Sequence, residues 1–204
     1  MNEDTRIKYA EKRIIELLEK EELKKIPQEL KEKIAYFYEE RSKRRLETAI
    51  LIFNCSKEEK KMQSLSMEYS DYSESVAAAY YAMYYIVHAY LAKKYSLKLK
   101  EDVRGVHAIT HNLILYYLVK TKKLAKHLYE EYLKTLETAA ETQKLDVEDF
   151  EEQAQNYAGM YEQRRKAREN FTYQVTRSVE AHHAEQAISI AKEFIGTIRE
   201  IMIK

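Results

Sequence analysis

The sequence contains very little glycine, proline or cysteine: three glycines, one proline and one cysteine among 204 residues. Strands joined by tight turns need glycine and proline, so this composition excludes a protein built mainly from β-sheet. Three scattered glycines also cannot form the glycine-rich loop with which Rossmann and P-loop proteins hold phosphate. Because Cys55 is alone, an internal disulfide and a cysteine-based zinc site are excluded, and a reducing compartment is favoured.

The residues that are abundant favour helices. Charged residues make up 34% of the chain and hydrophobic residues 45%, a balance typical of long amphipathic helices. We expect an all-α fold, an antiparallel up-and-down helical bundle with an N-terminal helical extension. The net charge of +1 gives no overall attraction to nucleic acid, so any such site must be a local cluster. The charged N-terminus is unlike a signal peptide and no segment suits a membrane span, so we expect a cytoplasmic protein.

Hydrophobic residues recur at helical spacing along most of the chain. This spacing predicts helices over residues 4–25, 28–54, 76–92, 106–118, 123–141, 146–168 and 178–204, a polar loop over 55–71 and a charged connection over 98–104. Ser178 is the expected N-cap of the last helix. In the second helix, the expected core stripe includes Leu30, Ile34 and Phe37. We expect residues 1–30 to form the extension and residues 31–204 the bundle.

Two arginines continue the apolar stripe of the predicted helix over residues 146–168. Whole helical turns from Phe150 lead to Arg164 and Arg168 on the same inward-looking face. An unpaired buried charge is unfavourable, so these side chains need partners. They predict a partly buried site for a phosphate, or arginines at a subunit interface. The alternative is that this face reaches solvent at the helix end, or that residues such as Glu169 neutralise it.

Two other clusters are weaker signals. Arg41, Lys43, Arg44 and Arg45 form a second basic block, which we interpret as a solvated face rather than a nucleic-acid site. Histidines also lie four residues apart on one predicted helix, at positions 107 and 111, and a third metal ligand would have to come from His88. A pair at this spacing is more typical of packing than of metal binding, so we expect neither a metal nor a cofactor.

Three ordered motifs resemble the HEPN domain family. The segment AAAYYAMYYIVHAYLAKK is similar to the second helix of these domains, and the Arg104–His107 segment RGVH is similar to the start of their third helix. The Arg168–Tyr173 segment RENFTY, followed by AKEFI at Ala191–Ile195, resembles the family's C-terminal motif. The resemblance covers about residues 33–204. It implies a helical bundle, commonly a homodimer, that handles nucleotides or RNA.

The resemblance implies one of two activities. Many HEPN proteins are metal-independent endoribonucleases with an R-x(4–6)-H motif, whereas others are catalytically silent partners of minimal nucleotidyltransferases in toxin–antitoxin pairs. Here the family's arginine position falls on Arg168 and its histidine position on Tyr173. Tyrosine, with a pKa near 10, is a poor base at neutral pH, but its hydroxyl can hold a phosphate. The resemblance therefore implies a non-catalytic nucleotide- or RNA-binding module with a nucleotidyltransferase partner, in which Arg168, Tyr173 and Arg164 contact phosphate.

Two alternatives remain. Arg177 and His182 match the R-x(4–6)-H spacing literally, as do Arg104 and His111. The first pair lies beside a helix N-terminus that could help bind phosphate, and it predicts a metal-independent endoribonuclease. The other alternative is a structural protein in which the arginines serve only a dimer interface, formed by the last two helices.

Overall fold

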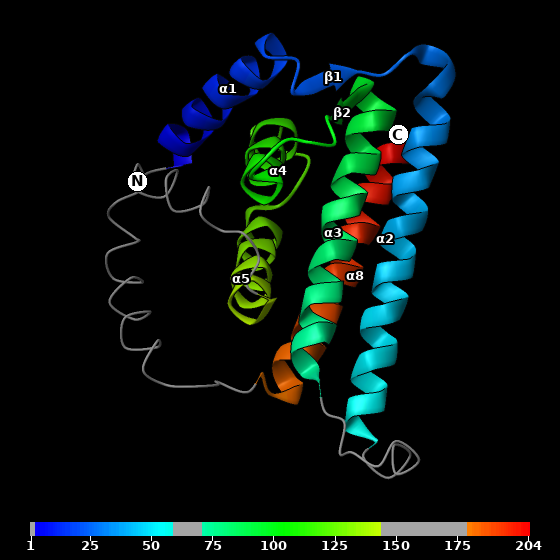
Figure 1. The fold of residues 1–204 in the computed structure, drawn as a ribbon. Helices are drawn as coiled ribbons and strands as arrows, with labels where there is room; N and C mark the ends of the chain where they lie inside the picture. Colours follow the sequence, from blue (N-terminus) through cyan, green and yellow to red (C-terminus); the bar gives the residue numbers. More distant parts are fainter. Residues whose placement is uncertain (1–2, 59–70, 144–178) are drawn as a thin grey trace.

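The structure is a computed structural model that describes residues 3–58, 71–143 and 179–204 (Figure 1). The N-terminal part consists of α1 (Glu3–Glu19), β1 (Leu23–Lys25), α2 (Gln28–Lys57) and α3 (Tyr72–Tyr95). There follow β2 (Leu97–Leu99), α4 (Val106–Ile114), the π-helical turn η2 (Leu115–Val119), α5 (Lys126–Gln143) and α8 (Ala181–Ile203). The predicted all-α bundle is confirmed. The predicted helix over 146–168 lies outside the described residues.

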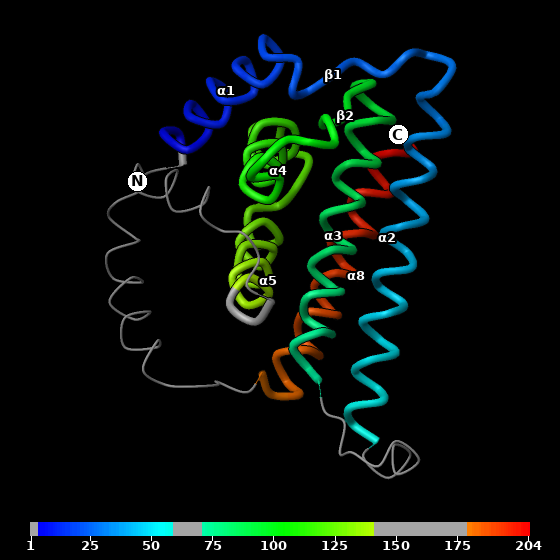
Figure 2. Tube along the Cα trace, viewed as in Figure 1, coloured from blue at the N-terminus to red at the C-terminus, as the bar shows by residue number. Residues whose placement is uncertain are grey.

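Helix α3 is the central helix of the bundle. It is apolar on all sides because alanines and tyrosines fill most of its length, and it contacts α2, α5 and α8. Successive long helices alternate in direction: α2 runs down the view, α3 up, α5 down and α8 up (Figures 1 and 2). Fully buried rings join the layers, as where Tyr132 of α5 stacks on Phe194 of α8 with their centroids 5.6 Å apart.

Small residues bring α2 close to α3 and fix their register. The buried face of α2 carries Ala35, Ser42 and Ala49. The hydroxyl of Ser42 donates a hydrogen bond of 2.7 Å to the carbonyl oxygen of Ala82, and the hydroxyl of Ser75 donates one of 2.8 Å to that of Ala49. A shift of one helix along the axis of the other would leave these buried hydroxyls without acceptors, which is unfavourable. The two hydrogen bonds therefore determine which side chains of α2 and α3 face each other.

The core stripe predicted for α2 is wrong at its N-terminal end. Leu30 and Phe37 are 42% and 52% exposed, whereas Ala35 is buried instead. Close approach to α3 selects the alanine and serine face, since larger side chains would hold the two helices apart. Phe37 is thereby left at the surface, beside the line where α2 meets α3.

The predicted helix over residues 4–25 is wrong beyond Glu19. Glu21 takes a left-handed conformation (φ 54°), and the chain then forms β1, which pairs antiparallel with β2. A short two-stranded sheet therefore exists despite the scarcity of glycine, and it occupies the start of the connection predicted over 98–104. Helix α1 packs on α4 and η2 and buries Ala10, Ile14 and Leu17 in the same core as α3.

The last helix begins later than predicted. Its N-cap is Glu180, not Ser178, which lies outside the described residues. The carboxylate of Glu180 accepts a hydrogen bond from the backbone of His183, and the imidazole of His183 accepts one from the backbone N–H of Glu180, so the two residues cap the helix reciprocally. In the described ranges, no helix has the length and apolar character that crossing a membrane requires.

Candidate functional site

Most of the sequence-predicted site residues fall outside the described part of the chain: Arg164, Arg168, Tyr173 and Arg177. His182 is described and lies in the first turn of α8, as predicted. Its side chain is exposed, and its Nδ1 lies 3.2 Å from a carboxylate oxygen of Glu180. The structure therefore places one member of the Arg177–His182 pair, at an accessible helix N-terminus.

The three histidines weighed as metal ligands each bond to a hydroxyl. His88 Nε2 lies 3.1 Å from the hydroxyl of Thr110, and His107 Nδ1 lies 2.7 Å from that of Tyr80. His111 is hydrogen-bonded to the hydroxyl of Tyr129. Within the residues that the structure describes, no group of three or more histidine, cysteine or acidic side chains is arranged to hold a metal ion. These histidines are part of the packing between α3, α4 and α5.

Burial keeps these histidines neutral. Removal from water lowers the pKa of His88 to about 3, with a smaller contribution from nearby His107. Burial likewise lowers the pKa of His111 to about 4, helped by the positive charge of Arg6. Burial also lowers the pKa of His107. The physical cause is that a buried imidazolium loses its hydration, which disfavours the charged form.

The most distinctive surface feature is formed where α2 meets α3. The guanidinium carbon of Arg41 lies 5.1 Å from the ring centroid of Phe37 and 5.2 Å from that of Tyr85. The guanidinium carbon of Arg45 lies 5.5 Å from the ring centroid of Tyr81. Arg45 lies one helical turn after Arg41 on α2, and Tyr81 lies one turn before Tyr85 on α3. Because the two helices run in opposite directions, each of these arginines contacts one of these tyrosines. We call Arg41, Arg45, Tyr81 and Tyr85 the arginine–tyrosine face.

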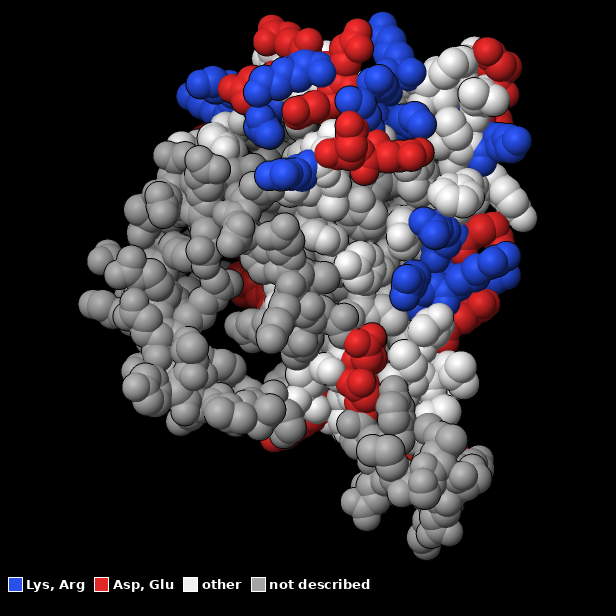
Figure 3. Space-filling model, viewed as in Figure 1, with Lys and Arg blue, Asp and Glu red and all other residues white. Residues whose placement is uncertain are grey.

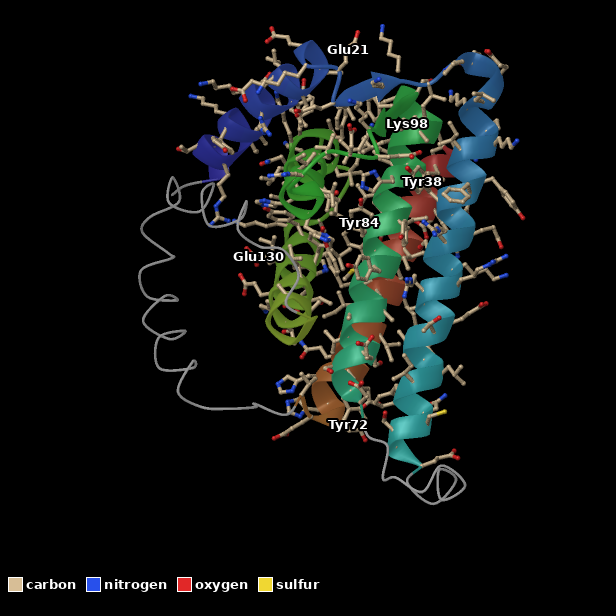
Figure 4. The ribbon with its side chains drawn as sticks, viewed as in Figure 1. Glu21, Tyr38, Tyr72, Tyr84, Lys98 and Glu130 are labelled. Atoms are coloured by element: carbon tan, nitrogen blue, oxygen red, sulfur yellow. The ribbon has the colours of Figure 1, made fainter. Side chains whose placement is uncertain are left out.

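A row of three tyrosine rings crosses this face. The ring centroids of Tyr81 and Tyr85 are 6.4 Å apart with their planes at 30°, and those of Tyr85 and Tyr38 are 6.3 Å apart with their planes at 23°. Tyr84 meets Tyr81 and Tyr85 edge-on, at 77° and 80°. Tyr84 in turn packs on His88, with the centroids 4.5 Å apart. Figure 4 shows Tyr38 and Tyr84 at neighbouring levels on α2 and α3.

The arginine–tyrosine face is positively charged. Among the described residues, no carboxylate forms an ion pair with Arg41, Arg44 or Arg45. Figure 3 shows basic side chains gathered over the middle of α2, with acidic side chains beside them. Burial raises the pKa of the tyrosines packed there, so they stay neutral at physiological pH and do not offset the arginines; these are Tyr38, Tyr81 and Tyr84.

Such a face combines the two contacts that single strands of nucleic acid use. A guanidinium stacked on an aromatic ring keeps its N–H edge available for a phosphate, and the ring holds the guanidinium in place. Partly exposed aromatic faces stack on bases. Sequence reasoning assigned this basic block to solvent. All four side chains of the block are exposed, as that interpretation expects. What the sequence did not indicate is that the matched spacing of Arg41 with Arg45 and of Tyr81 with Tyr85 brings the two pairs into contact when α2 lies against α3.

Comparison of the chain with protein-family models, with curated proteins and with solved structures finds no match.

Proposed function

We propose that this protein is a non-catalytic, nucleotide- or RNA-binding module of the HEPN type, which works in the cytoplasm with a minimal nucleotidyltransferase as partner. The motifs around Tyr80, Arg104 and Arg168 support the family assignment by resemblance. In this proposal Arg164, Arg168 and Tyr173 contact phosphate, as the resemblance implies, and the protein acts as a homodimer.

A single observation on the described residues carries the RNA-binding part of the proposal. Arg41 and Arg45 are exposed cations that are stacked on aromatic rings and have no carboxylate partner in the described ranges. On a chain whose charges nearly cancel, two such arginines form a local site for a phosphate backbone. The adjoining tyrosines add contacts to bases, which a plain basic surface lacks.

Binding of a short unstructured RNA tests the proposal. We expect measurable affinity at about 50 mM salt that weakens steeply towards about 200 mM, because binding releases counterions from the phosphates. Fluorescence anisotropy with a labelled oligonucleotide measures both quantities. Arg168→Ala should weaken binding by about tenfold and lower the slope of log affinity against log salt by about 0.7, the contribution of one phosphate contact on a single strand. An absence of binding at low salt would refute the proposal.

A second function is favoured by the surroundings of His182. Its exposed imidazole is oriented by the carboxylate of Glu180, an arrangement that suits a general acid or base. With Arg177 it would form a metal-independent endoribonuclease, in which a ribose 2′-hydroxyl attacks the adjacent phosphorus and the 5′-oxygen leaves.

This activity predicts RNA cleavage in the presence of EDTA, with 2′,3′-cyclic phosphate ends. His182→Ala should slow cleavage by about 10²–10⁴-fold, the usual contribution of an acid–base group. His127→Ala is a matched control, because His127 is also exposed and lies 3.6 Å from a carboxylate oxygen of Glu193. Intact RNA after long incubation with wild-type protein would exclude this function and leave the binding module.

A further inference from the structure

The outer side of α2 carries exposed hydrophobic side chains. Leu30, Phe37 and Leu51 are 42%, 52% and 63% exposed, and Figure 1 shows α2 at the edge of the bundle, away from α1 and α5. We infer that this side of α2 packs antiparallel against α2 of a second copy of the chain, and that the dimer joins two arginine–tyrosine faces into one surface. The interface differs from the one expected on the last two helices. Only the joined surface rests on the proposed RNA-binding function.

The spacing of the exposed residues carries the inference. Leu30, Phe37, Arg44 and Leu51 follow one another at intervals of seven residues, so they lie along one line of the helix. We call these four residues the heptad stripe. It is about 33 Å long, because each residue adds about 1.5 Å to a helix. A repeat of seven residues is the pattern with which two helices pack side by side along their length.

An antiparallel pairing matches the heptad stripe to itself. Both ends of the stripe are leucines, so reversing one helix places Leu30 of one copy against Leu51 of the other, and Phe37 against Arg44. A two-fold axis repeats each contact. The exposed half of Phe37 then packs on the aliphatic stem and planar guanidinium of Arg44. A parallel pairing would instead place the Arg44 side chains of the two copies against each other, where they repel.

The charges beside the heptad stripe fit the same register. Lys33 and Glu47 are exposed, and neither forms an ion pair with another residue in the described ranges. In the antiparallel register Lys33 of one copy lies beside Glu47 of the other, so the dimer contains this ion pair twice. Glu40 of one copy lies within a helical turn of Arg44 of the other. In a parallel pairing Lys33 would face Lys33 and Glu47 would face Glu47.

The antiparallel dimer places both arginine–tyrosine faces on one side. Arg41 and Arg45 flank the heptad stripe towards α3, where they lie over Tyr85 and Tyr81. The two-fold axis of an antiparallel helix pair is perpendicular to the plane of the two helices, so the same flank of each copy faces the same side. The four arginines therefore line one surface, and phosphates bound between them relieve their repulsion. For this reason RNA binding and dimerisation strengthen each other.

Analytical ultracentrifugation without RNA tests the interface. We expect a monomer–dimer equilibrium for the wild-type protein. Leu51→Glu should raise the dissociation constant of the dimer by about tenfold or more, because the two-fold axis places a carboxylate against Leu30 twice. Ile15→Glu is a matched control, since Ile15 is 51% exposed on α1, and it should leave the dimer unchanged. A wild-type protein that is monomeric at all concentrations, or an equal effect of both variants, would overturn the inference.

Exchange of charges tests the register. Lys33→Glu and Glu47→Lys should each raise the dissociation constant of the dimer about threefold or more, because each places like charges together across the interface twice. The combined variant Lys33→Glu/Glu47→Lys should restore the wild-type value. The two positions are 14 residues apart in one helix, about 21 Å, so this rescue cannot arise within one copy. Both side chains are exposed, so the fold tolerates the changes. A combined variant as weak as the single ones would refute the antiparallel register.

A titration with RNA separates this inference from the proposed function. The short unstructured RNA should lower the dissociation constant of the wild-type dimer about fivefold or more. Leu51→Glu leaves the arginine–tyrosine face intact and should still bind RNA, more weakly than wild type. RNA binding by a protein that never dimerises would overturn this inference and leave the proposed function intact. A dimer that binds no RNA would overturn the proposed function and keep the interface, and a dimer that RNA does not tighten would overturn the joined surface.

Discussion

Reversing two charges, in the variant Arg41→Glu/Arg45→Glu, should lower the affinity for single-stranded RNA by about a hundredfold or more at low salt. Two phosphate contacts are lost, and two carboxylates are placed where the backbone of the strand would run. The slope of log affinity against log salt should fall by about 1.4, because each phosphate contact on a single strand contributes about 0.7. A salt series of anisotropy titrations measures both effects.

A control with the same change of net charge separates this site from general attraction. Lys43 lies on the same helix but faces a different side, and Lys192 lies on α8; both are exposed. The variant Lys43→Glu/Lys192→Glu should weaken binding only a few-fold, through the change in overall charge. If it weakens binding as much as Arg41→Glu/Arg45→Glu does, the arginine–tyrosine face is not the site.

The free energy of unfolding should fall by about 4 kcal/mol between about pH 7.5 and pH 5, because of His88 and His111. In the folded protein burial holds the pKa of His88 at about 3 and that of His111 at about 4, whereas the unfolded chain has the ordinary histidine value near 6.5. Below pH 6.5 the unfolded state therefore binds more protons than the folded state. The free energy of unfolding keeps its full value above pH 6.5 and decreases as the pH falls towards the pKa values of the two histidines in the folded protein. Denaturant unfolding at a series of pH values measures the loss.

Two variants separate the buried histidines from the carboxylates that also titrate in acid. His111→Gln removes one titrating group while keeping a polar side chain near Tyr129, so the loss between pH 7.5 and 5 should shrink by about half. His88→Gln removes the other buried titrating group and should also shrink the loss by about half. An unchanged pH dependence in His111→Gln would show that this histidine is not buried in the neutral form.

The helices themselves were largely predictable because their determinants are local. Apolar spacing located the starts of α2 and α4 to within a residue, and the run of alanine and tyrosine identified α3 as the central helix. The ends were less predictable. Helix α1 stops at Glu19 and the last helix starts after Glu180, since a left-handed residue and a reciprocal cap override a periodic pattern that continues past both.

The candidate site, unlike the helices, was not predictable from local sequence. Arg41 and Arg45 were visible as a basic block, but a solvated helix face and a binding site have the same local sequence. Tyr81 and Tyr85 were visible only as part of an apolar helix. Whether these tyrosines contact the arginines depends on the register between α2 and α3. Two buried serine hydroxyls fix this register by hydrogen bonds across the helix interface.

The sequence alone determined that this protein is a helical bundle centred on the segment from Val76 to Ala92, because helix formation and burial follow from composition and spacing within one segment. Only the tertiary structure decided which arginines meet aromatic rings and that Phe37 is exposed. These outcomes depend on how α2 and α3 pack against each other. The packing face of α2 is set by small side chains, Ala35, Ser42 and Ala49, which contribute little to a hydrophobic pattern in the sequence.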